Sequence, residues 1–187
     1  MQIRDAGVND CAAITAIYED AVRNGTATYE IDPPSPAEMA ARMAAVAEAG
    51  LPWIVATRDD QVIGYAYAAP FRPRPAYRFT VENSIYLAPD AQGMGVGRML
   101  LEHLVEAVAA LGYRQMVAVI GDGTPQSASV RLHTASGFRH SGTLVASGYK
   151  HGRWLDTVYM QLVMNGGDAS PPDPASEPER RFLSATR

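Results

Sequence analysis

A strand-like run, a glycine-rich turn and a helix follow one another directly between Thr80 and Leu111. The turn reads Gln92-Gly93-Met94-Gly95-Val96-Gly97, so glycine recurs at every second position where the helix begins. Glycines have no side chain to keep a ligand away from the main chain. The first N–H groups of a helix have no partner within it, and the helix dipole is positive at that end. The stretch therefore predicts a pyrophosphate site, with Arg98 as a cation beside it.

Two common phosphate-binding motifs do not fit this turn. The nucleotide P-loop requires Gly-Lys-Ser or Gly-Lys-Thr, whereas Lys150 is the only lysine of the chain. The dinucleotide motif Gly-x-Gly-x-x-Gly also fits poorly, because the sixth position counted from Gly95 is Leu100. The spacing that fits is Gln92-x-x-Gly95-x-Gly97 after a strand and before a helix.

The rest of the chain alternates between strand and helix patterns, recognised by the periodicity of its apolar residues. Strands are expected over 2–6, 52–57, 61–70, 80–87, 114–121 and, as two strands around a turn, 143–164; helices are expected over 9–25, 35–50, 95–111 and 127–137. The second helix opens on a capping-box pattern, Ser35-Pro36-Ala37-Glu38. This order predicts an α/β fold with a mixed sheet. One domain is expected over 1–164, followed by a flexible tail, 165–187, rich in Pro, Ser and acidic residues.

Composition and charge exclude several classes of function. The net charge of the 187 residues is −4, and no Lys/Arg cluster suggests a nucleic-acid-binding face. A single cysteine, Cys11, excludes an internal disulfide. The four histidines have no metal-type spacing, so no metal is expected. No apolar run approaches the roughly 18 residues of a membrane span, and the N-terminus lacks the apolar region of a signal peptide. We therefore expect a cytoplasmic protein.

Four segments resemble one family of enzymes. "QGMGVG" resembles the acetyl-CoA loop of the GNAT superfamily of N-acetyltransferases. "TVENSIYL", "AVIGDGTPQSASVRLHTASGF" and "GYKHGRWLD" resemble a strand, a strand–helix pair and the C-terminal hairpin of the phosphinothricin and methionine sulfoximine acetyltransferases. The similarity extends from about Ile3 to Met164. It implies the GNAT (acyl-CoA N-acyltransferase) fold, a mixed central sheet with flanking helices, acetyl-CoA as acetyl donor and a homodimer.

The resemblance assigns a set of residues to acetyl-CoA. It implies a bulged strand whose N–H groups, around Tyr86 or Leu87, hold the thioester carbonyl, while the strand pairs with the pantetheine arm. An ordinary central strand is the competing reading. The expected donor-binding residues are Ile85, Tyr86, Leu87, Gln92, Gly93, Met94, Gly95, Val96, Gly97, Arg98, Thr124, Gln126 and Ser129. Ser129 is alternatively a cap of its short helix. Gln126 stands where relatives usually carry asparagine, and its longer side chain puts that contact in doubt.

Two residues are candidates for proton transfer. Strand alternation places Glu82, Ser84 and Tyr86 on one face and Asn83 on the other. Glu82 is the expected base, since apolar surroundings raise the pKa of a carboxyl; an ordinary ion pair with Arg78 or a neighbour is the competing reading. The resemblance implies that His133 protonates the leaving thiolate. The alternatives are a histidine buried in packing, or one that only hydrogen-bonds the cofactor sulfur.

A proline-broken basic segment precedes the strand that carries Glu82. Arg72 and Arg74 are two residues apart, and arginine binds carboxylates through a planar fork. A solvated basic loop is the competing reading, but the resemblance favours a site for the carboxylate of a small amino acid. The expected substrate-binding residues are Arg72, Arg74, Tyr77, Glu82, Asn83 and Ser84. Lys150, Trp154 and Asp156 of the C-terminal hairpin are expected either to shape the pocket or to make a dimer contact.

The resemblance implies direct acetyl transfer to the α-amine of L-phosphinothricin, L-methionine sulfoximine or L-methionine sulfone, and with it resistance to a herbicide. No cysteine nucleophile is implied, because Cys11 lies on the first helix. Two other readings stay open at this point. The acceptor is a protein or peptide amine or another amine metabolite, or the chain is an acyl-CoA-binding module without catalysis.

Overall fold

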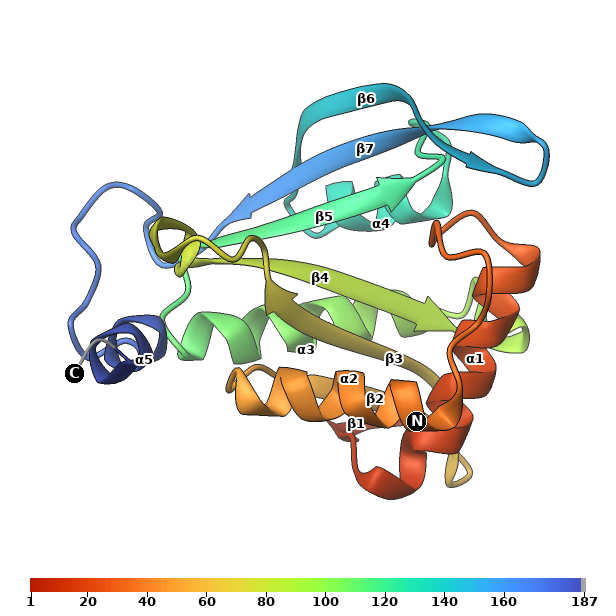
Figure 1. Cartoon of the computed structure of the whole chain (residues 1–187), viewed down its shortest axis with the longest axis horizontal. Helices are drawn as coiled ribbons and strands as arrows, with labels where there is room; N and C mark the ends of the chain where they lie inside the picture. The colour runs from red at the N-terminus through yellow and green to blue at the C-terminus, as the bar shows by residue number, and fades with distance from the viewer. Residues whose placement is uncertain (186–187) are drawn as a thin grey trace.

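The computed structural model describes residues 1–185 and contains one mixed sheet with helices on both faces (Figure 1). The sheet has the order β1-β2-β3-β4-β5-β7-β6. Its strands are β1 (Gln2–Asp5), β2 (Trp53–Arg58), β3 (Gln61–Pro70), β4 (Thr80–Leu87), β5 (Gln115–Gly121), β6 (Arg139–Lys150) and β7 (Arg153–Val163). The helices are α1 (Cys11–Asn24), α2 (Pro36–Glu48), α3 (Val96–Ala110), α4 (Ala128–Ala135) and α5 (Glu177–Ala185). The predicted α/β fold is therefore confirmed, and so is the predicted order of elements up to residue 164.

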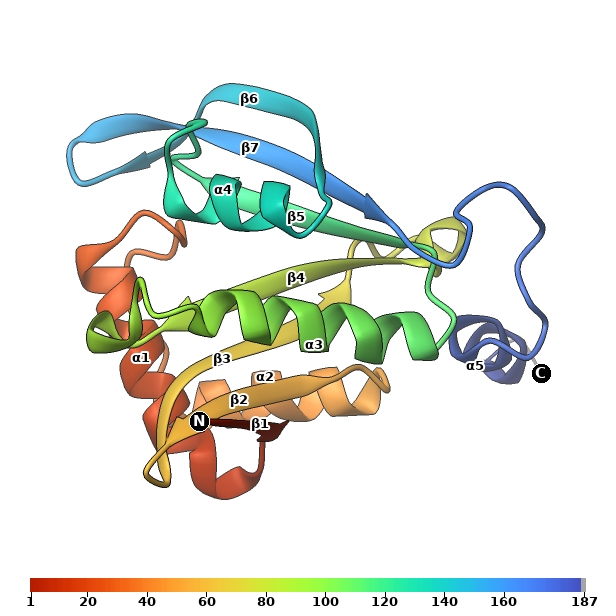
Figure 2. The ribbon, with the colours of Figure 1, turned by 180° about the vertical axis from the view of Figure 1, so that it is seen from behind.

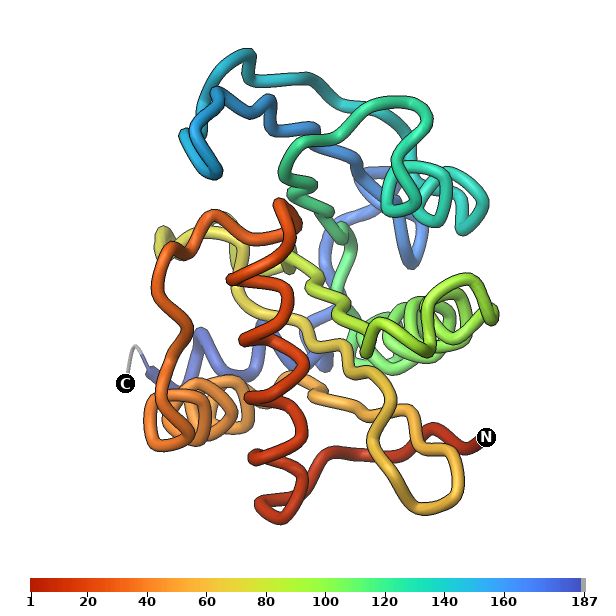
Figure 3. The backbone as a smooth tube through the Cα atoms, turned by 90° about the vertical axis from the view of Figure 1, so that its right-hand side faces the viewer, coloured from red at the N-terminus to blue at the C-terminus, as the bar shows by residue number. Residues whose placement is uncertain are grey.

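The helices form two layers. Helices α1 and α2 cover one face of the sheet, while α3 and α4 cover the other (Figure 2). The tube in Figure 3 shows the sheet between them. Each layer is held by apolar residues at helical spacing. Ile14, Ile17 and Val22 of α1 are buried, as are Leu100 and Leu104 of α3. Met99 of α3, although apolar, is 40% exposed.

The capping box predicted at the start of α2 is present. The Ser35 hydroxyl accepts a hydrogen bond from the Glu38 N–H at 3.2 Å, and the Glu38 carboxylate accepts one from the Ser35 N–H at 2.7 Å. The two residues thus satisfy N–H groups that have no partner within the helix. Helix α1 begins differently. Asp10 stands at its N-cap position, but the Asp10 carboxylate binds the Gly7 N–H and the guanidinium of Arg4 instead.

All but one of the neighbouring strand pairs are antiparallel. The exception is β4–β5, a parallel pair that extends only from Thr80–Gln115 to Asn83–Ala118. Beyond it β4 continues to Leu87 and β5 to Gly121, and the two strands separate (Figure 1). The bulge expected in β4 is absent, since the β3–β4 register is continuous from Gly64–Leu87 to Pro70–Val81. The free edges of β4 and β5 result from this separation.

The segment after Met164 is not irregular throughout. Residues 177–185 form α5, which hydrogen-bonds to the main body of the protein, whereas the sequence reading placed only a flexible tail there. The proline and acidic residues of this segment are typical of a flexible tail. The contacts that stabilise α5 are with residues distant in the sequence, so the local pattern does not indicate them. The boundary expected at residue 164 remains a prediction, and the expected tail also includes residues 186–187, which lie outside the described residues.

Candidate active site

A cleft of about 570 Å³ lies where β4 and β5 separate. Its lining comes from five elements: the end of α1 and the following turn, the second half of β4, the end of β5, the glycine turn with α3, and α4. The lining residues used below are Asn83, Ser84, Ile85, Tyr86, Leu87, Gln92, Gly93, Gly97, Ser129 and His133.

The side chains of β4 point to opposite faces of the sheet, as the alternation predicted. Tyr86 packs edge-on against Tyr18 of α1, with ring centroids 4.9 Å apart. Residues of the same parity, including Glu82, therefore face the α1 layer. Asn83 has the other parity and meets His133 of α4, with 2.9 Å between Nδ2 and Nε2. Asn83 was predicted to bind substrate together with Glu82, but the structure places the two side chains on opposite faces.

The main chain of β4 alternates as well, and this decides which N–H groups reach the cleft. Phe71 N–H donates to Thr80 O, and Ala88 N–H donates to Ile63 O. In an antiparallel ladder these hydrogen-bonded pairs recur every second residue, so Tyr86 exchanges its hydrogen bonds with Tyr65. The N–H groups of Ile85 and Leu87 then point away from β3, into the cleft. Of the two donors expected from the sequence, Leu87 fits and Tyr86 does not.

The glycine turn presents a row of unpaired N–H groups. Gly93 and Gly95 have φ angles of +73° and +82°, a conformation that glycine adopts without strain. Among the described residues, no acceptor takes the N–H groups of residues 93–97, whereas those of Arg98 and Met99 already bond to Gly95 O. Helix α3 starts at Val96 and adds its positive dipole end. This arrangement suits a pyrophosphate, as the sequence pattern predicted.

Glu82 is half-buried on the α1 side of β4. Burial raises the pKa of its carboxyl, and the positive charge of Arg72 acts in the opposite direction. The ion pair with Arg78, the competing reading, is wrong because Arg78 pairs with Glu179 at 2.8 Å. Glu82 therefore has the environment of a proton acceptor that works closer to neutrality than an ordinary carboxylate.

His133 is 4% exposed and held on both ring nitrogens. Nδ1 lies 2.8 Å from the carbonyl oxygen of Ser129, which can only accept, so Nδ1 carries the proton. Nε2 of the neutral ring then accepts from the Asn83 amide. Burial lowers the pKa of His133, which favours this neutral form. The Oδ1 atom of Asn83 is buried and has no hydrogen-bond partner among the described residues. This geometry does not favour the acid role predicted for His133.

The remaining predicted donor residues divide into two groups. Ile85, Tyr86, Leu87, Gln92, Gly93, Gly97 and Ser129 line the cleft, whereas Met94, Gly95, Val96, Arg98, Thr124 and Gln126 are not in its lining. The Arg98 cation is already paired with Glu102 at 2.7 Å. Ser127, not Ser129, caps α4 by accepting the Val130 N–H. Acetyl-CoA binding stays a prediction for all thirteen positions.

The predicted basic loop is exposed beside Glu82. The Arg72 guanidinium lies 4.3 Å from the ring centroid of Phe71, and its charge influences the Glu82 carboxyl. Tyr77 packs edge-on against the same Phe71 ring and is 45% exposed. Within residues 1–185, neither Arg72 nor Arg74 forms an ion pair. Two unneutralised guanidinium groups are thus available to an anion.

The sequence analysis missed a cluster on the same side of β4. Tyr67 of β3 stacks on Trp53 with ring centroids 4.1 Å apart. Tyr18 donates to the Glu30 carboxylate at 2.9 Å, and Arg42 pairs with that carboxylate at 2.7 Å. Tyr67 could have been found from the register, because it is opposite Ser84. The Tyr18–Glu30–Arg42 contacts join two helices and a loop, and no local pattern indicates them.

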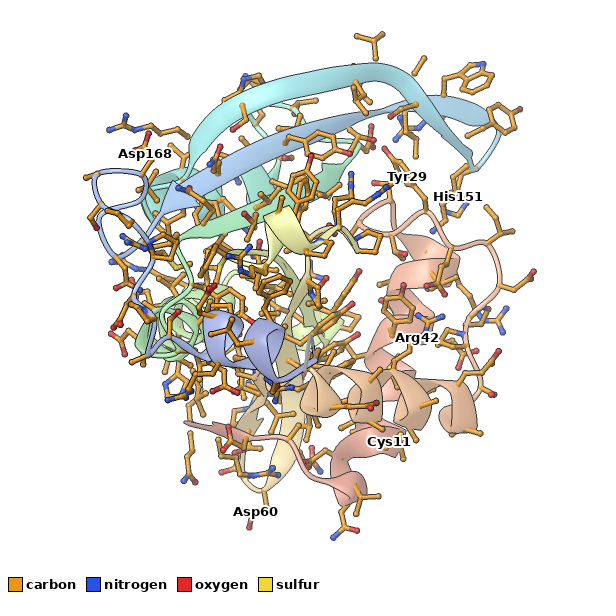
Figure 4. All side chains as sticks on the ribbon, turned by 60° about the vertical axis from the view of Figure 1, so that its left-hand side comes forward. Cys11, Tyr29, Arg42, Asp60, His151 and Asp168 are labelled. Carbon is orange, nitrogen blue, oxygen red and sulfur yellow. The ribbon has the colours of Figure 1, made fainter. Side chains whose placement is uncertain are left out.

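Figure 4 labels Arg42 above α2 and Cys11 at the far end of α1. The Cys11 thiol is buried, donates to Pro36 O and does not line the cleft. In the described part of the chain no group of His, Cys, Asp or Glu is arranged to hold a metal ion. A search of the same residues finds no helix long and apolar enough to cross a membrane.

The glycine turn at the start of α3 forms the phosphate site that the resemblance to acyl-CoA-dependent acyltransferases implied. Comparison with known proteins agrees: residues 14–138 match the model of the acetyltransferase (GNAT) family. The chain is 52% identical over 165 residues to phosphinothricin N-acetyltransferase of Alcaligenes faecalis, covering 88% of this chain and 83% of that one. It is 42% identical to the L-methionine sulfoximine/L-methionine sulfone acetyltransferase of Pseudomonas paraeruginosa, covering 90% and 98%.

A solved structure gives the same result. The phosphinothricin acetyltransferase from Sinorhizobium meliloti, crystallised in complex with AcCoA, superimposes with a TM-score of 0.92 at 50% identity, covering 95% of this chain and 96% of that one. The chain belongs to the acetyltransferase (GNAT) family.

Replacing His133 with Gln is expected to reduce the acid sensitivity of folding. Because burial holds the pKa of His133 below 6.5, the unfolded chain binds this proton at a higher pH than the native chain. The stabilising effect is complete above about pH 6.5 and is lost as the pH falls through the lower pKa of the folded ring. Urea unfolding at about pH 7.5 and about pH 5.5 should show a smaller stability loss in His133→Gln than in the wild type.

The exposed His140 is the matched control, and His140→Gln should lose as much stability as the wild type over this pH range. An equal loss in His133→Gln would contradict the assignment of a buried, neutral His133.

Proposed function

We propose that this enzyme transfers the acetyl group of acetyl-CoA to the α-amino group of a small amino acid such as L-phosphinothricin, L-methionine sulfoximine or L-methionine sulfone. The observation that carries the proposal is that β4 contributes to two separate sites. Its free edge and the glycine turn form a donor cleft, while Glu82 and the basic loop lie toward the α1 face.

The donor is bound mainly by the main chain. The N–H groups of residues 93–97 hold the pyrophosphate, and the free edge of Ile85 and Leu87 pairs with the pantetheine arm as a further strand would. The Leu87 N–H polarises the thioester carbonyl. His133 accepts a hydrogen bond from the Asn83 amide and so fixes the orientation of this cleft-lining side chain beside the arm.

Catalysis is direct transfer between the two substrates. Glu82 removes a proton from the ammonium group, itself or through a water molecule, so that the nitrogen has a free lone pair. That nitrogen attacks the thioester carbon, the new C–N bond forms and the C–S bond breaks. Coenzyme A leaves as a thiolate and takes up the second proton, which the nitrogen loses when it becomes an amide. The raised pKa of Glu82 makes it a stronger base than an exposed carboxylate.

The acceptor is held by its carboxylate. Within residues 1–185 no ion pair includes Arg72 or Arg74, so both supply positive charge, and Tyr77 packs against Phe71 in the same loop. Ser84 lies on the Glu82 face, opposite Tyr67. The two guanidinium groups favour an amino acid whose carboxylate is next to the reacting amine. A peptide amine or a polyamine has no carboxylate in that position.

We also propose a homodimer that forms through the C-terminal hairpin. β6 is an edge strand of twelve residues, and exposed hydrophobic side chains along such an edge favour pairing with another chain. Tyr149 and Trp154 are 58% and 66% exposed. The only cysteine is free and buried, which suits a reducing compartment, and we assign the enzyme to the cytoplasm.

The proposed function predicts a selective acceptor profile. Thiol release from acetyl-CoA is measured with L-phosphinothricin, L-methionine sulfoximine, L-methionine sulfone, L-methionine, a polyamine and peptides with a free N-terminus or lysine. Fast release is expected with the first three only. Release with a peptide or polyamine alone would discard the substrate class but not the donor site. Acetyl-CoA binding without release would favour a binding module.

Glu82→Gln is expected to lower kcat about 10²- to 10⁴-fold, because the amide cannot accept the ammonium proton. The base must be deprotonated, so wild-type kcat/KM falls as the pH drops through the Glu82 pKa. Since burial raises that pKa, the fall begins at a higher pH than for an exposed carboxyl. Stopped-assay rates across pH should show no such limb in Glu82→Gln. Glu106→Gln, at an exposed carboxylate of α3, is the control and should retain wild-type rates. A retained rate in Glu82→Gln would remove Glu82 as the base.

Trp154→Asp is expected to convert a dimer into a monomer, because a charge replaces the most exposed aromatic ring of the hairpin. Size-exclusion chromatography with light scattering measures the mass. Val8→Asp changes an 82% exposed hydrophobic residue outside the hairpin and should leave the dimer intact. A monomeric wild type, or a dimeric Trp154→Asp variant, would contradict the interface.

A further inference from the structure

The loop that carries Arg72 and Arg74 has little support of its own. Three prolines, Pro70, Pro73 and Pro75, remove N–H donors from it. The side chains of residues 72–77 are exposed. The short helix η2 (Pro75–Tyr77) is tied to the loop by the Tyr77 N–H to Arg74 O bond at 2.9 Å. A loop of this kind needs an outside contact to hold a defined conformation.

Arg78 supplies that contact, and its partner is α5. The Arg78 guanidinium donates to the Glu179 carboxylate at 2.8 Å and to the Pro75 carbonyl at 3.2 Å. It also lies over the rings of Phe79 and Phe182, at 4.5 and 4.6 Å from their centroids. The ion pair is mostly shielded from solvent, with 27% of the Arg78 side chain and 19% of the Glu179 side chain exposed. One side chain thus connects η2 with two residues of the C-terminal helix.

Helix α5 is itself fixed to the ends of other helices. The Glu177 N–H donates to Leu111 O at 2.9 Å, and Arg181 donates to Glu48 O at 2.7 Å. Two glycines make room for it: a Cβ on Gly112 would lie 2.6 Å from that of Ser176, and a Cβ on Gly50 would meet the Arg181 guanidinium. Figure 1 shows α5 at the end of α3, on the side of the molecule where β3 and β4 are joined. Because α5 is fixed to the ends of α2 and α3, its contact with Arg78 can hold the 71–79 loop in a fixed place relative to these two helices.

We propose that α5 is a positioning element for the substrate, and that the Glu179–Arg78 ion pair with Phe182 holds the 71–79 loop in the conformation that presents Arg72 and Arg74. This rests on the proposed function, in which those arginines bind the acceptor carboxylate. Glu179 and Arg78 do not touch the reacting atoms. Their loss loosens the loop and weakens binding of the amino acid, while the acetyl-CoA site at the glycine turn stays unchanged.

The test compares Glu179→Ala and Phe182→Ala with Arg180→Ala in the full-length chain. Arg180 lies on the same helix, its side chain is 62% exposed, and among the described residues it forms an ion pair with Glu177 alone, so its variant is a matched control. For Glu179→Ala and Phe182→Ala, KM for the amino acid is expected to rise about three- to tenfold, with kcat and KM for acetyl-CoA unchanged. Glu179→Gln, which keeps the shape but not the charge, should fall between the wild type and Glu179→Ala.

Hydrogen exchange of peptides covering 71–79 provides a readout that does not depend on activity. Exchange is expected to become faster in Glu179→Ala and to stay at the wild-type rate in Arg180→Ala. Unchanged exchange and unchanged KM in Glu179→Ala would overturn the proposal. A parallel change in both KM values would also overturn it, because it would indicate a general loss of structure. A wild type inactive on every amino acid would instead refute the proposed function, while the exchange rates would still test the ion pair.

Discussion

The separation of β4 from β5 after Asn83 and Ala118 is the constraint on which the active site depends. Main-chain N–H and C=O groups inside a protein are costly to leave without partners. Here the second halves of β4 and β5 keep unpaired N–H and C=O groups on their facing edges. The space between the two edges can therefore accept an extended ligand that pairs with them. Leu87 is close in sequence to the glycine turn, and Glu82 is five residues upstream of Leu87. The single strand β4 therefore places both the edge that faces the donor cleft and the carboxylate of Glu82.

Local signals predicted the elements well. The capping box of Ser35 and Glu38, the glycine turn before a helix and the alternation of Glu82, Asn83 and Ser84 are read from residues a few positions apart, and the structure has each of them. The site's long-range contacts could not be predicted in this way. Asn83 meets His133 across 50 residues, and Arg78 meets Glu179 across 101. Which β4 N–H groups face the cleft also depends on pairing with β3, which no single strand specifies.

Burial acts in opposite directions on the two titratable groups of the site. It raises the pKa of Glu82 and lowers the pKa of His133, since in both cases the charged form loses solvation. For the carboxylate this favours the role of base that we propose for Glu82. For the imidazole it favours a neutral ring whose two nitrogens are already engaged, and which suits the orientation of an amide better than proton donation. The same physical effect therefore separates a catalytic role from a positioning role.

The distribution of arginine explains how an acidic protein attracts an anionic substrate. Nine ion pairs neutralise nine arginines of the described residues, among them Arg98 beside the glycine turn. Within residues 1–185, Arg72 and Arg74 are without such a partner, although Arg78 in the same loop has one. A positive field survives only where cations cluster without counter-charges, so the loop presents such a field near Glu82. If Glu179 did not engage Arg78 from outside, the loop would carry a third free guanidinium and no fixed conformation. Charge and rigidity are thus supplied to the loop by different residues.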